Sequence, residues 1–404
     1  PITGGDDDFD DVLRERRHAL RVYAGDDVRV ESNRFTAWRT VNVVTLNGVD
    51  VANAAVRGNG FNALGQPPGA GPDWDHSAIY TDCDGAVIED NTFSTLGVGT
   101  FGVRAAIEVH GPNQVVFKNR IDDFAGGINA TGVSVLGSDS VQIVSNRIAG
   151  VADGIRIWAF EVAGNPPGEP VLRDASIRNN RIEIAVDPWR ITQDAFEQPN
   201  RGVSLVGASD GVIENLEIVG NTVIFGDFGG APRAYDRGSA GIRLVPDLVP
   251  DLPIRGLTVS GNTLVNALAK GIDVGVALPE GASMVGNTIV DAGVGPPSLT
   301  IFDRSAFEFF GTYGDVDILD TCVIDTDPSG PRLAQTLLLR PTSTGGSRIL
   351  GTAHDLAGGA LDFLTTIGQT GSPWLIQTPT SVCPRLFADG FELGDTSAWT
   401  ATVP

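Results

Sequence analysis

Two short phrases of alternating apolar and polar residues recur along most of the chain. The first has apolar residues, then Asn, then usually Thr or Arg, then another apolar residue, as in VVFKNRI (115–121) and LTVSGNTL (257–264). Its asparagine occurs nine times, at Asn33, Asn59, Asn91, Asn119, Asn146, Asn180, Asn221, Asn262 and Asn287. The shortest intervals predict a basic coil of about 25 residues, and the longer intervals predict insertions.

The second phrase precedes most copies of the first, as in AIEVHG (106–111), DGIRIWA (153–159) and AGIRLVP (240–246). Its period-two alternation predicts strands, and glycine before the strand marks a bend between sheets. Each coil therefore holds at least two short parallel strands, stacked on its neighbours at roughly 4.8 Å. We expect the asparagines to form a ladder in equivalent turns. The pattern predicts an all-β protein, with a parallel β-helix over residues 19–295.

The Gly-Ile-x-Val and Gly-Asn-Thr-Ile phrases resemble the pectate-lyase-like superfamily of right-handed parallel β-helix proteins. This resemblance implies the handedness of the solenoid. It leaves the function open, because the superfamily includes polysaccharide lyases, glycosidases, epimerases, adhesins and phage tailspikes. The pair Asp122–Asp123 lacks the downstream Gly-His-Gly of the polygalacturonases, which argues against a typical pectin hydrolase.

The ends of a solenoid need covers. We expect an N-terminal capping helix within residues 1–18, since DDDFDDVLRERRH (6–18) places aspartates in its first turns and basic residues in its last. A calcium site in DDDFDD is an alternative. We further expect a strand-rich C-terminal cap over residues 296–385. The final segment, residues 386–404, includes a stretch that resembles a tail of exported proteobacterial proteins.

Charge and cysteine usage narrow the function. A net charge of −22 argues against a nucleic-acid partner, although arginines can still gather locally around an anionic ligand. No apolar stretch is long enough to cross a bilayer. In an exported protein we expect Cys322 to pair with Cys383, which leaves Cys83 as a buried thiol. We expect a secreted or cell-surface protein.

Strand alternation places candidate chemistry on one outward face. A first outward column contains Tyr80, Glu108, Arg156 and Arg243, and a second contains Asp82, His110 and Trp158. Long insertions at 61–77, 159–175, 185–200 and 225–239 supply the further candidates Trp74, Asp75, His76 and Tyr235. Together they predict a groove for a polysaccharide, with no metal site among them.

Three functions remain open. In a polysaccharide lyase acting on a uronate-containing glycan, Arg156 or Arg243 would neutralise the sugar carboxylate. His110, oriented by Asp82, or Tyr80 would act as the base, and Tyr80 as the acid. A glycoside hydrolase would use Asp82 and Glu108. A surface adhesin or self-assembling β-helix would have no catalytic group. For each residue, the alternative is an ordinary surface ion pair or packing role.

Overall fold

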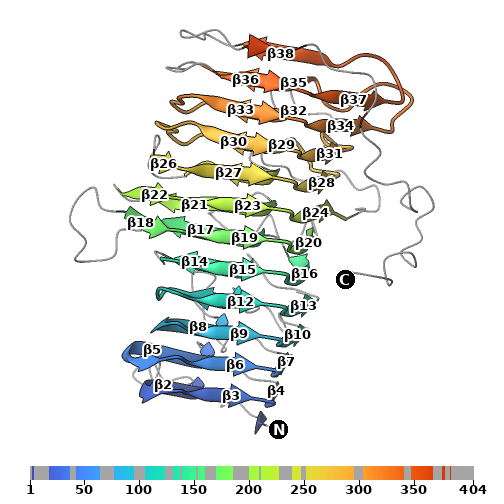
Figure 1. Cartoon of the computed structure of the whole chain (residues 1–404). Helices are drawn as coiled ribbons and strands as arrows, with labels where there is room; N and C mark the ends of the chain where they lie inside the picture. Colours follow the sequence, from blue (N-terminus) through green and yellow to red (C-terminus); the bar gives the residue numbers. More distant parts are fainter. Residues whose placement is uncertain are drawn as a thin grey trace, which may run out of the picture.

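The structure, a computed structural model, is all-β in every part that it describes, and no helix occurs there. Its strands stack in coils, from the first coil (blue) at the bottom of Figure 1 to the last coil (red) at the top. The described residues are 2–3, 18–36, 42–63, 77–94, 105–122, 131–136, 139–151, 153–159, 170–184, 200–208, 211–226, 239–246, 252–294, 304–340, 347–366, 375–377 and 383.

Three parallel sheets of 12 strands each form the solenoid, and a sheet of three strands lies beside them. Sheet A contains β1 (Ile2–Thr3), β4 (Arg34–Thr36), β7 (Gly60–Asn62), β10 (Thr92–Ser94), β13 (Arg120–Asp122), β16 (Arg147–Val151), β20 (Arg181–Ile184), β24 (Thr222–Phe225), β28 (Thr263–Val265), β31 (Thr288–Val290), β34 (Cys322–Asp325) and β37 (Ala353–Leu356). Sheet B contains β2 (His18–Asp26), β5 (Asn42–Ala52), β8 (Ser77–Asp84), β11 (Ala105–Val109), β14 (Thr131–Leu136), β17 (Asp153–Ala159), β21 (Arg201–Ala208), β25 (Ala240–Leu244), β29 (Lys270–Val274), β32 (Ser305–Phe309), β35 (Gln335–Leu339) and β38 (Asp362–Thr366).

Sheet C contains β3 (Arg29–Glu31), β6 (Ala55–Arg57), β9 (Val87–Glu89), β12 (Val115–Phe117), β15 (Gln142–Val144), β19 (Ser176–Arg178), β23 (Glu217–Val219), β27 (Leu257–Ser260), β30 (Ala282–Val285), β33 (Val316–Leu319), β36 (Arg348–Leu350) and β39 (Leu375–Ile376). The side sheet contains β18 (Pro170–Arg173), β22 (Val212–Glu214) and β26 (Ile254–Arg255). Neighbours within each sheet are one coil apart. This arrangement confirms the predicted right-handed parallel β-helix.

The asparagine ladder is confirmed at all nine positions. Each ladder asparagine from Asn33 to Asn262 donates its backbone N–H to the Oδ1 of the next one, at 2.9–3.1 Å. From Asn59 onward, the side-chain Nδ2 also donates to a backbone carbonyl of the preceding coil, such as that of Val116 for Asn146. Because these amides are buried, their mutual bonding offsets the cost of removing them from water.

The residue before each ladder asparagine adopts a left-handed backbone conformation. Its φ lies between 54° and 66° at Ser32, Gly58, Asp90, Lys118, Ser145, Asn179, Gly220, Gly261 and Gly286. This conformation turns the chain from sheet C into sheet A in two residues. It explains why glycine, asparagine, aspartate and serine are frequent there, since they tolerate positive φ best.

Apolar side chains from all three sheets fill the interior in continuous stacks. In sheet A, Phe35, Phe61 and Phe93 occupy successive coils, with ring centroids 4.9 and 4.8 Å apart. Valine, isoleucine and leucine continue the same core to the C-terminal coils. β-Branched side chains suit this core because each strand packs on both neighbours and on the opposite sheets.

The parallel β-helix continues past residue 295, where the sequence predicts a separate strand-rich cap. The strands β32 to β39 join the same three sheets in the same order. The repeat is faint here because Thr321 and Thr352 take the ladder position, each after a left-handed residue and each buried. The prediction of strands is confirmed, but the boundary is not, since threonine replaces the asparagine that marks the coils in the sequence.

The two ends differ in what the structure describes. The expected N-terminal helix lies mainly in residues 4–17, outside the described residues, as does the DDDFDD segment. Ile2–Thr3 pair with β4 as a strand, and His18 begins β2.

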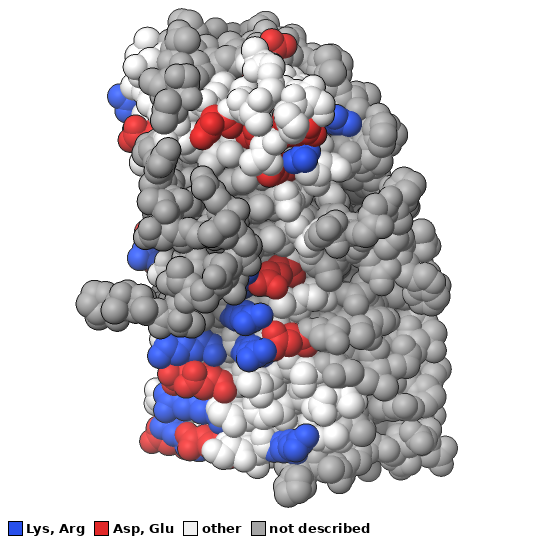
Figure 2. All heavy atoms as spheres, turned by 90° about the vertical axis from the view of Figure 1, so that its right-hand side faces the viewer, with Lys and Arg blue, Asp and Glu red and all other residues white. Residues whose placement is uncertain are grey.

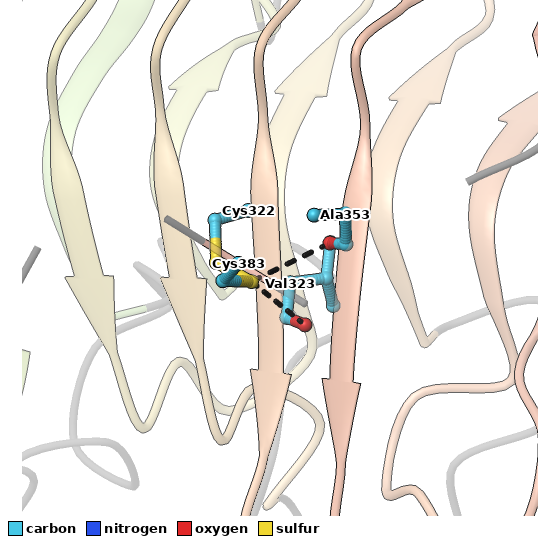
Figure 3. Close-up of a disulfide and its surroundings, with 4 residues drawn as sticks. All are labelled: Cys322, Val323, Ala353 and Cys383. Carbon is cyan, nitrogen blue, oxygen red and sulfur yellow. Dashed lines mark hydrogen bonds between the residues drawn. A yellow bond between two sulfur atoms is a disulfide. The ribbon is translucent and has the colours of Figure 1, made fainter. Parts of the chain in front are cut away.

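The expected pair Cys322–Cys383 is a disulfide, and Cys83 is buried and free. Figure 3 shows Cys383 held against the outside of sheet A, its sulfur 3.6 Å from the Ala353 carbonyl oxygen.

Removing one rung of the ladder tests its contribution to stability. In Asn146→Ala, the buried carbonyl of Val116 and the backbone N–H of Asn119 lose their partners. We expect the free energy of unfolding to fall by at least about 2 kcal/mol, measured by denaturant titration. The control Asn62→Ala, which alters one exposed contact to Ser94, should change it by less than about 0.5 kcal/mol. Equal losses of unfolding free energy in the two variants would show that a ladder asparagine contributes no more to stability than an exposed contact.

His354 makes the last coils sensitive to pH. It lies beside Val323 in the sheet A register, and its Nε2 is 2.8 Å from the Thr336 hydroxyl. Burial lowers the pKa of His354 below its ordinary value of 6.5. The neutral ring therefore stabilises the folded state above about pH 6.5, and this contribution disappears as the pH falls through the folded-state pKa. The protection factors of the β37 amides against hydrogen exchange should fall in mild acid, and His354→Gln should flatten that dependence.

Candidate functional site

The first predicted column is correct in register along the outer side of sheet B. Successive strands pair Tyr80 with Glu108, Glu108 with Ser134, Ser134 with Arg156, Arg156 with Ser204, Ser204 with Arg243, and Arg243 with Asp273. The column continues to Glu308 and Leu338 in the C-terminal coils. The strand registers therefore align chemistry that is spread over more than 200 residues of sequence.

The second column follows its prediction only as far as Trp158. Asn47 pairs with Asp82, and Leu136 pairs with Trp158. Trp158 then pairs with Gly207 and not with Val206, which strict alternation would place there, because a register shift follows Ile157. Such a bulge moves one strand by a residue, which strict alternation in the sequence does not reveal.

A third column, which the sequence analysis missed, begins each of these strands. Asp153, Arg201 and Lys270 lie three residues before Arg156, Ser204 and Asp273, with a glycine directly after each. At Gly154 and Gly202 an added Cβ would lie 2.4 Å from a core side chain, so only glycine fits that bend. The signal was present in the sequence as the charged residue before the glycine of the second phrase.

Burial distinguishes sheet B from the other two sheets. On sheets A and C the ion pairs are solvated, such as Arg181–Glu183 with 49% and 33% of the side chains exposed. Figure 2 shows such side chains in alternating rows of blue and red along the lower coils. On sheet B, Glu108, Asp153, Arg156, Lys270, Asp273 and Glu308 are all buried. Burying a charge costs several kcal/mol per ion unless the charge is paired. The burial of these six groups therefore requires specific partners.

The cluster in the N-terminal half joins Tyr80, Glu108 and His110. Glu108 Oε1 lies 2.7 Å from His110 Nε2, and its Oε2 accepts a hydrogen bond from the Ser77 hydroxyl. The Tyr80 ring packs against the imidazole, with centroids 4.6 Å apart. Asp82, which we expected to orient His110, is exposed. Glu108 takes that place, because residues two apart on a strand, such as Glu108 and His110, point to the same side.

A second cluster contains Asp153, Arg156 and Trp158. Asp153 Oδ2 binds the Arg156 guanidinium, and both side chains are at most 2% exposed. The Arg156 Cζ lies 5.6 Å from the centre of the Trp158 ring. We expected Arg156 to be solvent-accessible, and this is wrong, because the residue before Gly154 supplies a buried counter-charge.

A third cluster crosses four C-terminal coils. Lys270 Nζ lies 3.2 Å from Asp273 Oδ2 and also contacts Glu308. Arg243 Nε is 3.8 Å from Asp273, and Arg340 Nε is 2.6 Å from Glu308. Burial, then Asp273, raises the pKa of Glu308 against the opposing effect of Lys270 and Arg340. Burial alone would lower the pKa of Lys270, but Asp273 and Glu308 raise it overall, so Lys270 stays charged.

Several predicted residues are not among those described. Trp74, Asp75, His76 and Tyr235 lie in the segments 64–76 and 227–238, outside the described residues. The structure therefore brings together Tyr80, Glu108 and His110, and separately Arg156 and Trp158. Arg243 belongs to the third cluster, away from the other predicted residues.

A depression of about 780 Å³ lies over sheet C, on a different side of the solenoid. It is lined by Asp174, Glu217, Glu280, Asp315 and Asp317, among others. Exposed arginines pair with three of these carboxylates, as in Arg348–Asp317. Solvated ladders of this kind need no ligand, so we place the candidate site on sheet B.

Within the described part of the chain, no three His, Cys, Asp or Glu side chains gather to hold a metal ion. Nor does that part of the chain contain a helix with the length and apolar character needed to span a bilayer. Burial, followed by Asp82 and Asp84, raises the pKa of the Cys83 thiol to about 11, so it is unreactive at neutral pH.

Comparison with known proteins finds similar solved structures but no matching family. A scan of family models and a search of curated proteins both found no match. Among solved structures, a DFA-IIIase from Arthrobacter chlorophenolicus is 10% identical with a TM-score of 0.45, covering 90% of this chain and 88% of that one. The surface adhesin PfbA of Streptococcus pneumoniae is 13% identical (TM-score 0.44; 84% and 85% covered). The catalytic unit of a GH87 α-1,3-glucanase from Streptomyces thermodiastaticus is 17% identical (TM-score 0.46; 90% and 64% covered).

The buried pair Asp153–Arg156 should be sensitive to loss of one charge. Asp153→Asn keeps the side-chain shape but leaves the Arg156 guanidinium buried without a counter-charge. We expect the free energy of unfolding to fall by about 3–5 kcal/mol. Glu217→Gln, which breaks the exposed pair with Arg178, should cost less than about 1 kcal/mol. Similar small losses in both variants would mean that Arg156 has solvent or another partner.

Proposed function

We propose that this chain is an exported carbohydrate-active β-helix protein that cleaves a uronate-containing glycan by β-elimination. Tyr80, Glu108 and His110 would form its acid–base centre. The observation that supports this proposal is the 2.7 Å contact between Glu108 Oε1 and His110 Nε2, with the Tyr80 ring beside the imidazole. A buried carboxylate that orients a half-buried histidine is a usual arrangement for a general base.

In this proposal each group has a separate role. Glu108 accepts the Nε2 proton of His110 and fixes the tautomer whose Nδ1 lone pair is available. Nδ1 then removes the proton at C5 of the uronate. The released electron pair forms the C4=C5 double bond as the C4–O bond breaks. The Tyr80 hydroxyl gives its proton to the leaving oxygen, so that no net charge accumulates on the glycan.

Elimination also needs a cation at the sugar carboxylate. Arg156 is two strand intervals from Glu108, roughly 9–10 Å at the usual strand spacing. Its guanidinium is bound to Asp153, so a sugar carboxylate would have to take the place of Asp153 to be neutralised there. Trp158 beside Arg156 would support the apolar face of a neighbouring sugar ring.

Export is part of the same proposal. The Cys322–Cys383 disulfide is of a type that persists in oxidising compartments, outside the cytosol. A polysaccharide is then the natural partner for an extracellular groove with carboxylates, arginines and aromatic rings. Self-association of the solenoid stays a prediction.

Exchanging single residues separates elimination from hydrolysis. On the glycan selected by an array screen, His110→Ala and Glu108→Gln should each lower turnover by roughly a hundredfold or more, since both remove the base or its orientation. Asp82→Asn should leave turnover within about twofold. Product is followed by ultraviolet absorbance of the unsaturated sugar.

Other outcomes point to the other functions. If Asp82→Asn abolishes activity and the products carry reducing ends without ultraviolet absorbance, the chain is a hydrolase that uses Asp82 and Glu108. If glycans bind but are never cleaved, it is an adhesin. If none binds, the carbohydrate proposal is wrong.

A further inference from the structure

The third cluster ends in an arginine whose position is fixed by buried charges. Asp273 contacts Lys270, Lys270 contacts Glu308, and Glu308 lies 2.6 Å from Arg340 Nε. Exposure rises along this chain of contacts, from 1% for the Glu308 side chain to 38% for Arg340. The guanidinium is therefore anchored from inside while its outer end reaches the surface.

Arg340 differs from the exposed arginines that form ion pairs on sheets A and C. Those arginines pair with carboxylates that are themselves exposed, such as Asp317 with Arg348. The ionic contact of Arg340 with Glu308 is made by Nε, which is itself buried. An oriented guanidinium that is anchored through Nε is suited to bind a carboxylate with its outer nitrogens, through two parallel N–H···O bonds.

An aromatic residue neighbours Arg340 in the register of sheet B. Phe309 pairs with Leu339, so Phe310 and Arg340 follow as neighbours, and the Arg340 backbone N–H donates to the Phe309 carbonyl at 2.8 Å. The half-buried Phe310 ring covers Gly275 of the preceding coil. A Cβ added to Gly275 would lie 2.3 Å from the ring, so the missing side chain makes room for it.

We propose that Phe310 and Arg340 form a binding site for an acidic sugar unit. The apolar face of the sugar packs on the Phe310 ring, and its carboxylate accepts hydrogen bonds from Arg340 Nη1 and Nη2. A few convergent polar groups beside an apolar surface are typical of ligand sites. The chain Asp273–Lys270–Glu308 has a positioning role, since it holds the guanidinium without touching the sugar.

This site is separate from the Tyr80–Glu108–His110 centre. Seven strand intervals of sheet B lie between β11 and β35, roughly 34 Å at the usual spacing. The choice of an acidic sugar rests on the proposed function, but its binding does not require that the glycan be cleaved. The site would hold a long polyuronate at a distance from the reacting bond.

Calorimetric titration of the whole chain with free hexuronates tests the site. The probes are D-glucuronate, D-galacturonate, D-mannuronate and L-guluronate, each compared with its uncharged hexose. We expect at least one hexuronate to bind at least about tenfold more tightly than its hexose, because the charged hydrogen bonds are lost in the hexose. Arg340→Gln and Phe310→Ala should each weaken that binding by about tenfold or more.

Matched variants keep the result specific. Arg348→Gln changes a comparably exposed arginine of neighbouring β36 and should leave the affinity unchanged. His110→Ala should also leave it unchanged, so loss of turnover and loss of binding are distinguishable. Gly275→Ala should displace the Phe310 ring and weaken binding without altering charge; if that variant does not fold, Phe310→Leu replaces it. The proposal is wrong if none of the hexuronates binds, or if binding survives both Arg340→Gln and Phe310→Ala.

Discussion

Hydrogen bonding between successive coils is the constraint on which the rest of this structure depends. Each strand in the three sheets pairs with the strand one coil away, and the ladder asparagines bond one turn to the next in the same direction. Any coil can lengthen in its loops, but its strands must return to the same register. Insertions are therefore confined to the connections, where they leave the stack unchanged.

This constraint turns sequence distance into spatial order. Residues separated by 25 to 41 positions, such as Asn180 and Asn221, become direct neighbours. The same register aligns Glu108, Arg156 and Arg243 along sheet B. A rigid column of this kind holds side chains at fixed intervals along the solenoid.

The distribution of buried charge distinguishes sheet B from sheets A and C. Sheets A and C carry exposed pairs whose contribution to stability is small. Sheet B carries pairs withdrawn from water, joined through short contacts that differ from one cluster to the next. Apolar residues of similar volume at these places would often give an equally stable or more stable core, so the buried pairs are not explained by stability alone.

The sequence by itself determined the coil, the asparagine ladder and the outward column. Each of these depends on local alternation, as for Glu108, or on a spacing that repeats, as for Asn146. The cysteine pairing was expected from the cysteine usage of exported proteins. The C-terminal extent of the helix was missed because Thr321 and Thr352 preserve the turn while changing the residue that marks it. Only the tertiary structure decided which carboxylate meets His110, that Arg156 is neutralised by Asp153, and that Lys270, Glu308 and Arg340 form one chain of contacts. These pairings depend on a bend at glycine, a bulge at Trp158 and side-chain directions between coils, which single-strand periodicity does not specify.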